Sequence, residues 1–145
     1  AYEMSASLVG SEMCIRDRTK AIATENAPQA IGPYIQGVRS GNFIFTSGQL
    51  PIDPQTGTIP ECAEGQTRQS LENIQAIIEA GGLTVANICK MTIFVKDLNE
   101  FAAINDAYAA FFTQRNASFP ARSCVEVARL PKDVKVEIEA IAWQG

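Results

Sequence analysis

Arg122, Cys124 and Glu137, all near the C-terminus, carry groups that could bind and hydrolyse a small organic acid. A guanidinium can hold a carboxylate through two parallel hydrogen bonds, and Arg122 is the candidate for this role. A carboxylate close to the bound acid, such as that of Glu137, can orient a water molecule and accept its proton. The pattern therefore indicates a site that holds an anionic substrate beside an activated water.

Each of these residues also has a purely structural interpretation. Arg122 could form an internal ion pair with Glu126 or Glu137, and Glu137 could belong to a solvated strand face. Cys124 has no histidine or nearby lysine to activate its thiol, and buried cysteines are usually inert. We therefore expect the backbone N–H of Cys124, rather than its sulfur, to be the useful group.

The composition narrows the chemistry further. The 145 residues include no histidine, which excludes Ser–His and Cys–His nucleophile pairs and His-ligated zinc. No metal-ligand cluster or glycine-rich phosphate loop is present in the sequence. The net charge of −4 argues against a general affinity for nucleic acid or anionic membranes, and no apolar run reaches the ~18–20 residues of a transmembrane helix. Four cysteines without a CxxC pair indicate reduced thiols and a cytoplasmic protein.

Alternation of apolar and polar residues predicts how the three groups are placed. Residues 134–142 alternate strictly, as in a half-buried strand, and residues 119–127 form the strand before it. A turn over 130–133 would join the two into a hairpin with Glu137 opposite Cys124. If the valines of both strands face one core, the three chemical groups lie together on the opposite face.

The rest of the chain supplies further strands and two helices. We predict a strand over 19–23, a hairpin over 38–49, a helix over 61–80, a strand over 88–96 and a helix over 99–115 capped by Asn99. This order predicts an α+β domain, with two helices on one face of a mixed sheet. The other face is too apolar to be left in water and no element remains to cover it, so we expect a second copy to cover it in a homo-oligomer.

Four further residues lie where a ligand could meet them. Tyr34 ends a long loop over 25–34, Ser47 and Gly48 end a strand where the backbone can approach a neighbour closely, and Asn105 lies at the edge of a helical apolar stripe. Tyr34 could equally be a packing tyrosine, and Asn105 an ordinary solvated asparagine.

Residues 1–18 show no helical or strand period and lack the basic start and apolar centre of a signal peptide. We expect this segment to be a foreign, cloning-derived leader that is disordered. The folded domain is expected to span residues 19–145.

Residues 19–145 resemble the RidA (YjgF) family of reactive enamine/imine deaminases over essentially their whole length. The matching stretches are 23–28, 31–34, 45–49, 120–131 and 136–140. Both the arginine and the downstream glutamate typical of the active deaminases are present, as Arg122 and Glu137.

The resemblance implies a chorismate-mutase-like α+β fold that assembles as a homotrimer, with sites between subunits. It also implies an enzyme, a 2-iminobutanoate/2-iminopropanoate deaminase. Such an enzyme hydrolyses 2-aminocrotonate and 2-aminoacrylate, through their imine tautomers, to 2-oxo acids and ammonia. Pyridoxal-phosphate-dependent dehydratases release these intermediates, and the family itself needs no cofactor or metal.

Carried over to this sequence, Arg122 would bind the substrate carboxylate with help from the backbone N–H of Cys124. Glu137 would position the attacking water and shuttle protons. The pocket would be lined by Tyr34, Ser47, Gly48 and Asn105. Three alternatives remain open. One is a non-catalytic module that binds 2-oxo acids. Another is a ribonuclease or translation inhibitor, which the acidic charge and the absence of histidine disfavour. The third is a chaperone-like interaction role, which the sequence neither supports nor excludes.

Overall fold

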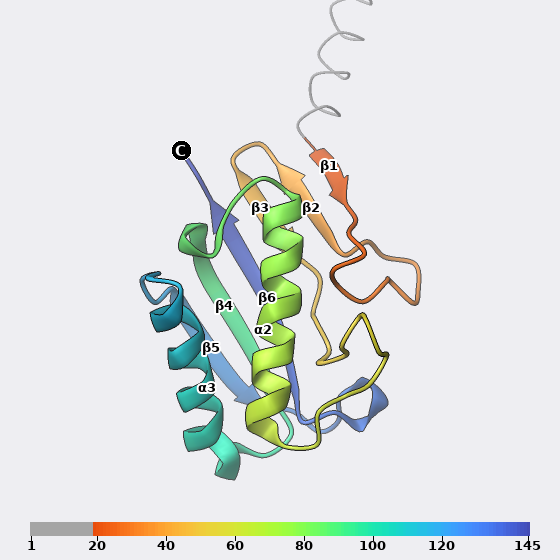
Figure 1. Cartoon of the computed structure of the whole chain (residues 1–145), viewed down its shortest axis with the longest axis vertical. Coiled ribbons are helices and arrows are strands. Elements are labelled where there is room, and N and C mark those ends of the chain that lie inside the picture. The colour runs from red at the N-terminus through yellow and green to blue at the C-terminus, as the bar shows by residue number, and fades with distance from the viewer. Residues whose placement is uncertain (1–18) are drawn as a thin grey trace, which may run out of the picture.

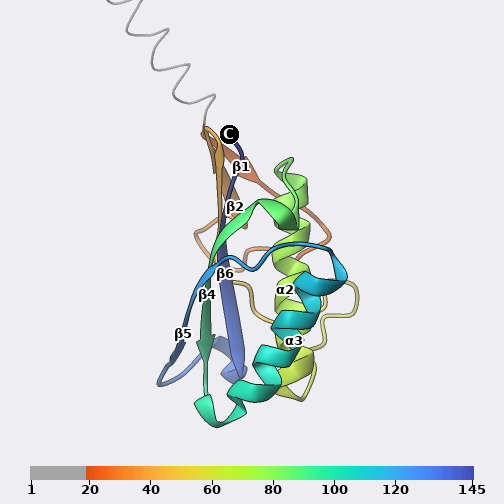
Figure 2. The same cartoon turned by 90° about the vertical axis from the view of Figure 1, so that its left-hand side faces the viewer.

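The computed structural model describes residues 19–145, so the expectations for residues 1–18 lie outside the described residues. The strands are β1 (Thr19–Ile22), β2 (Gly37–Ser40), β3 (Phe43–Thr46), β4 (Ile88–Val95), β5 (Ala121–Glu126) and β6 (Val136–Trp143), and the helices are α2 (Ala63–Ala80) and α3 (Phe101–Gln114). Single 3₁₀ turns lie at Val85–Asn87, Leu98–Glu100 and Pro131–Asp133. Both helices cover the same face of one sheet (Figures 1 and 2), which confirms the predicted α+β architecture.

The six strands are ordered β1-β2-β3-β6-β4-β5, and β4–β5 is the parallel pair. β4 therefore lies between β5 and β6, and the predicted hairpin of these two strands is wrong. Alternation along a strand indicates which residues share a face but not which strand is the neighbour. Here α3 connects β4 to β5 as a crossover, which is how a parallel pair is joined, and the chain then returns to the far side of β4.

Arg122 and Cys124 lie on the helix-covered side of the sheet. Met91 pairs with Arg122 and Ile93 with Cys124, and residues paired across neighbouring strands share a face. Met91 and Ile93 are completely buried beneath the helices. The prediction that Arg122 and Cys124 lie on the open face is therefore wrong, because β5 is an edge strand whose Val125 is 43% exposed and outside the core.

Glu137 lies on the opposite, open face of the sheet. It pairs with Phe94, while its neighbours Val136 and Ile138 are completely buried on the helix side. Since side chains alternate along a strand, the carboxylate points away from the helices. Glu137 and Cys124 are thus not opposite each other but on different faces, with β4 between them.

The core lies between the two helices and the sheet. Its completely buried side chains include Ile44, Leu71, Ile74, Ile77, Ile78, Met91, Ile93, Phe112, Val136 and Ile138.

Cys62 caps α2 by accepting a hydrogen bond from the Gly65 N–H at 3.3 Å. Before α3, Asp97 caps the 3₁₀ turn Leu98–Glu100 by accepting from the Asn99 N–H at 2.9 Å, and α3 itself begins after Glu100 without a side-chain cap, so the predicted cap by Asn99 is wrong.

Buried amide side chains hold the long loops in place. The Gln36 amide accepts from the Thr24 N–H at 2.7 Å and donates to the Thr24 carbonyl at 3.0 Å. The Asn73 amide donates to the carbonyls of Leu50 and Ile52, both at 3.0 Å. These hydrogen bonds satisfy backbone groups in the loops that have no partner within a strand or helix. They therefore hold the loops around residues 24 and 50–52 in fixed positions.

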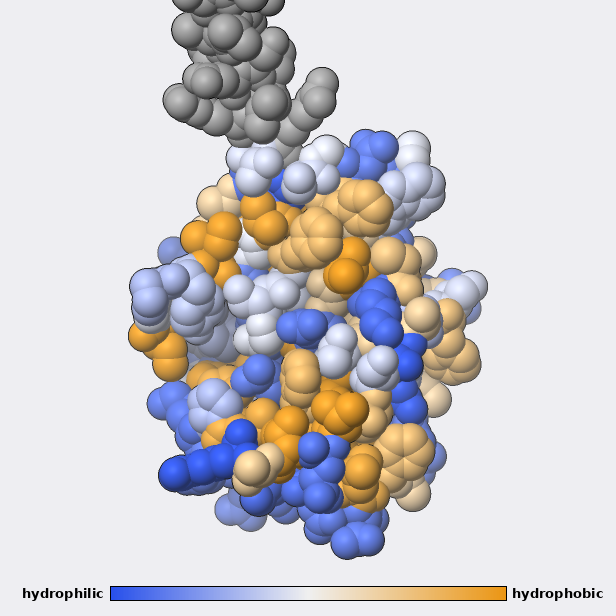
Figure 3. All heavy atoms as spheres, turned by 180° about the vertical axis from the view of Figure 1, so that it is seen from behind, coloured by the Kyte–Doolittle hydropathy of each residue, from blue (hydrophilic) through white to orange (hydrophobic). Residues whose placement is uncertain are grey.

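The open face of the sheet exposes large apolar side chains. Phe43, Phe45 and Trp143 are 41%, 40% and 47% exposed, and Phe43 pairs with Trp143 across β3 and β6. Figure 3 shows this face, where hydrophobic residues cover much of the surface. The predicted apolar open face is thus confirmed. None of the described helices is long and apolar enough to cross a membrane.

Candidate active site

One stripe of α3 surrounds the guanidinium of Arg122. The Arg122 Nη1 donates to Asn105 Oδ1 at 2.8 Å, and Cζ lies 4.8 Å from the ring centre of Tyr108 and 5.6 Å from that of Phe101. Phe101, Asn105 and Tyr108 are spaced i, i+4 and i+7, so they share one face of the helix. Phe101 and Tyr108 were not predicted as part of the site, although their spacing relative to Asn105 is a signal that could have identified them.

The positive charge of Arg122 is not neutralised within residues 19–145. The ion pairs in this part of the chain are Arg68–Glu64, Arg129–Asp133 and Lys135–Glu100. Glu126 instead accepts a hydrogen bond from the Leu98 N–H at 3.0 Å. The structural alternative for Arg122, an ion pair with Glu126 or Glu137, is therefore not formed, and the guanidinium remains available to an anion.

Cys124 presents a backbone donor next to Arg122. The Val127 N–H donates to the Val95 carbonyl of β4 at 2.9 Å, and N–H groups alternate in direction along a strand. The Cys124 N–H therefore points outward from the edge of the sheet. Burial raises the pKa of the Cys124 thiol, outweighing the opposite effect of Arg122, so the sulfur stays protonated and weakly nucleophilic.

Glu137 is half-buried and packs against the backbone at Gly48. A Cβ at Gly48 would lie 3.0 Å from Cδ of Glu137 and closer still to a carboxylate oxygen, so any larger residue there would push the Glu137 carboxylate aside. Burial, and secondarily the negative charge of Glu139, raises the pKa of Glu137 above its ordinary value. A carboxylate with a raised pKa is better suited to both accepting and returning a proton.

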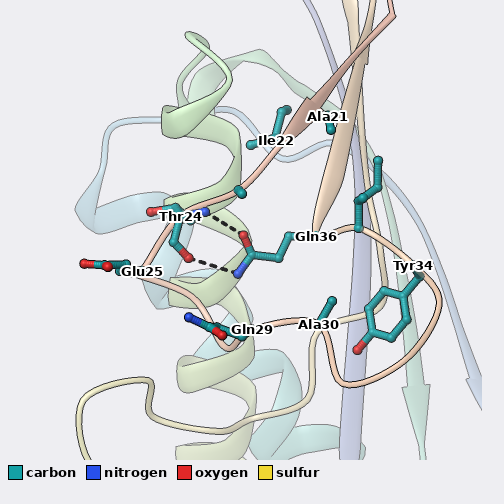
Figure 4. A pocket seen from close by; sticks show the side chains of 10 residues that line it. Ala21, Ile22, Thr24, Glu25, Gln29, Ala30, Tyr34 and Gln36 are labelled. Carbon is teal, nitrogen blue, oxygen red and sulfur yellow. Dashed lines mark hydrogen bonds between the residues drawn. The ribbon is translucent and has the colours of Figure 1, made fainter.

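Ser47 precedes Gly48 in the chain and is bonded to the loop that carries Tyr34. The Ser47 hydroxyl donates to the Ile35 carbonyl at 2.6 Å and its N–H to the Gln36 carbonyl at 2.8 Å, which ties the end of β3 to the loop that carries Tyr34. Tyr34 is 47% exposed and is not part of the core. It borders a pocket of about 370 Å³ next to β1, in which neither Arg122 nor Glu137 takes part (Figure 4).

The candidate residues thus form two separate groups in one chain. We call Arg122, Asn105 and Cys124 with the rings of α3 the arginine half-site, and Glu137, Gly48 and Ser47 the glutamate half-site, while Tyr34 lines the separate pocket beside β1. Glu137 and Val125 both pair with Phe94 of β4, from opposite sides of that strand. Val125 is three residues from Arg122 along β5. Strand geometry then places the Cα atoms of Arg122 and Glu137 roughly 14 Å apart, with their side chains on opposite faces. A four-carbon substrate cannot contact both groups within one chain.

Comparisons with known proteins agree with this architecture. A family model described as "Endoribonuclease L-PSP" matches residues 24–144. The chain belongs to this family, the RidA (YjgF) family. It is 67% identical over 124 residues to proteins from Salmonella typhimurium and Escherichia coli strain K12, each named "2-iminobutanoate/2-iminopropanoate deaminase". These matches cover 86% of this chain and 97% of each relative.

Solved structures of RidA-family proteins share the fold. The crystal structure of the E. coli YjgF gene product matches with a TM-score of 0.86 and 65% identity, covering 87% of this chain and 99% of that one. E. coli TdcF with bound serine matches with a TM-score of 0.85 and 59% identity, with the same coverage.

Within residues 19–145 no group of three or more histidine, cysteine, aspartate or glutamate side chains is arranged to hold a metal ion.

Proposed function

We propose that this RidA-family chain is a 2-iminobutanoate/2-iminopropanoate deaminase that releases 2-oxo acids and ammonia. The observation that carries the proposal is Arg122, whose charge no carboxylate of residues 19–145 neutralises. The outward N–H of Cys124 lies on the same strand edge. The names of its 67% identical relatives supply the substrate class. We place the reaction in the cytoplasm, in keeping with the free thiols of Cys62, Cys89 and Cys124.

Substrate binding uses the arginine half-site. The free N–H groups of Arg122 form a fork that matches the two oxygens of the imino-acid carboxylate, and the Cys124 N–H donates to one of them. This fixes C2, the imine carbon, relative to the protein. Positioning of this kind can supply a large part of a rate acceleration, because the reacting atoms no longer have to meet by diffusion.

The chemical step uses Glu137. Its carboxylate takes a proton from water while the water oxygen bonds to C2, and the electron pair of the C=N double bond moves to nitrogen. The proton held by Glu137 is then delivered to that nitrogen. Glu137 then takes the proton of the C2 hydroxyl and passes it to the amine nitrogen, so that the C–N bond breaks, ammonia leaves and the C2 oxygen forms the carbonyl of the 2-oxo acid. Glu137 ends as a carboxylate, so the cycle needs no other reactant.

A complete site requires a second copy of the chain. We propose a homotrimer in which the arginine half-site of one subunit faces the glutamate half-site of the next. The roughly 14 Å between the two Cα atoms and their opposite faces support this arrangement. The exposed Phe43, Phe45 and Trp143 on the open face also favour burial against another copy.

The direct test couples a threonine dehydratase to the protein and follows 2-oxobutanoate. Wild-type chain is expected to accelerate its appearance. Arg122→Ala should lower kcat/KM by about 30-fold or more, since removing one partner of a hydrogen-bonded charge pair costs about 2–5 kcal/mol. Arg129→Ala is the matched control, because Arg129 is 77% exposed and paired with Asp133. An assembled wild-type protein that gives no acceleration would refute the proposal.

The alternative function is a module that binds 2-oxo acids without hydrolysis. The arginine half-site favours it, because Arg122 and the Cys124 N–H could hold a carboxylate unaided. The half-buried Glu137 favours the enzyme, since a binding module gains nothing from a carboxylate placed near an anionic ligand.

A further inference from the structure

Tyr108 lies beneath Arg122 without forming a hydrogen bond of its own. Its side chain is 5% exposed, and its hydroxyl has no partner among residues 19–145. The Tyr108 ring packs against the rings of Phe112 and Phe119, with 5.0 Å and 6.4 Å between ring centres. The Arg122 Cζ lies 4.8 Å from the centre of the Tyr108 ring. Burial raises the pKa of Tyr108 to about 12, so the phenol is neutral and leaves the charge of Arg122 intact.

We propose that Tyr108 is a positioning residue for Arg122, and that the face of its ring, not its hydroxyl, holds the guanidinium ready for the substrate carboxylate. This inference rests on the proposed function of Arg122. An aromatic face attracts a cation through its quadrupole and occupies none of the N–H donors. A carboxylate in the same place would both neutralise the charge and occupy the fork.

Arg115, which directly follows the last residue of α3, also lies over an aromatic ring of that helix but is bonded differently. Its Cζ lies 3.8 Å over the Phe111 ring, but its Nε donates to Gln75 at 2.7 Å and its Nη1 to the Phe111 carbonyl at 3.0 Å. Two of the guanidinium nitrogens of Arg115 therefore donate to groups within the protein. Arg122 donates within residues 19–145 to Asn105 alone, which leaves most of its N–H groups free.

The test compares Tyr108→Leu, which removes the ring face, with Tyr108→Phe, which keeps it. We measure KM and kcat in the coupled assay and the Kd of 2-oxobutanoate by calorimetry. Tyr108→Leu is expected to raise KM and Kd about 3- to 30-fold with little change in kcat, the range of a partly desolvated cation–π contact. Tyr108→Phe should stay within about 2-fold, because the hydroxyl has no bond to lose.

Phe111→Leu is the matched control, because it removes the ring beneath the structural Arg115 of the same helix. It is expected to lower the melting temperature without raising the Kd. The inference is overturned if folded Tyr108→Leu binds 2-oxobutanoate as tightly as wild type, or if Tyr108→Phe weakens binding as much as Tyr108→Leu.

A measurement on the wild-type protein keeps the inference testable if Tyr108→Leu does not fold. Nitrogen-15 relaxation of the Arg122 Nε–H should give an order parameter near ~0.85, as for a rigid group, while the exposed Arg68 should give less than ~0.6. Equal mobility of the two arginines would overturn the inference. This relaxation measurement needs no turnover, so it tests the role of Tyr108 separately from the proposed function. Failure of the wild-type protein to hydrolyse imines would refute the proposed function instead.

Discussion

The two half-sites of this chain are built on opposite electrostatic principles. At the arginine half-site, Arg122 is held by an amide and two aromatic rings, and no carboxylate of residues 19–145 neutralises it. At the glutamate half-site, burial and a like charge raise the pKa of Glu137. The first arrangement favours binding an anion, and the second favours moving a proton. The difference suggests that each half-site serves one step, so each can be disabled separately.

Glu137→Gln should have the largest effect specific to the glutamate half-site. The amide keeps the shape of the side chain but cannot accept the proton of water, so kcat is expected to fall by about 10²- to 10⁴-fold. The Kd of 2-oxobutanoate, measured by calorimetry, should change little because Arg122 is untouched. If hydrolysis persists, Glu137 is not the proton carrier. If binding disappears with hydrolysis, the division of roles is wrong.

Gly48→Ala should disturb the same half-site through geometry alone. The added methyl group would overlap the Glu137 carboxylate and displace it from the attacking water. Since small misplacements of a catalytic group can be costly, kcat is expected to fall roughly 10- to 100-fold in steady-state kinetics. Gly32→Ala is the control, because its Cβ would meet ring atoms of Tyr34 at an ordinary 3.5 Å. Equal activities of the two variants would contradict the close packing of Glu137 on Gly48.

Glu139→Gln should give the smallest effect, a shift in the pH profile. The negative charge of Glu139 contributes to the raised pKa of Glu137, and its removal should lower that pKa. The proposed reaction requires ionised Glu137, so activity should be lost as pH falls through this pKa. The acid limb of kcat should therefore move to lower pH in the variant. Glu79→Gln, on the exposed side of α2, should leave the limb in place. An unmoved limb in Glu139→Gln would show that Glu139 does not act on the essential carboxylate.

Periodicity along the chain predicted both helices, the first hairpin and the apolar open face, because burial imposes these patterns directly. It could not predict that β4 separates β5 from β6, since alternation does not identify a strand's neighbour. Val125 illustrates the problem: a valine predicts a core position, but on this edge strand it is 43% exposed. The assumption that it faced the core placed Arg122 on the wrong side of the sheet.

The candidate site was predicted residue by residue but not in its arrangement. Arg122 and Glu137 follow from their chemistry and from the family resemblance. Phe101 and Tyr108 were not predicted as part of the site, because an aromatic beneath a guanidinium has the same spacing as an aromatic in a core. The separation of the half-sites depends on sheet order, which no local pattern contains.

The most direct test of the account is complementation between two inactive variants. Arg122→Ala retains an intact glutamate half-site, and Glu137→Gln retains an intact arginine half-site. When the two are unfolded together and reassembled at equal amounts, random mixing in a ring should create wild-type sites at about a quarter of the interfaces. We predict recovery of roughly that share of wild-type activity in the coupled assay. A mixed assembly as inactive as its two parents would contradict a site shared between subunits.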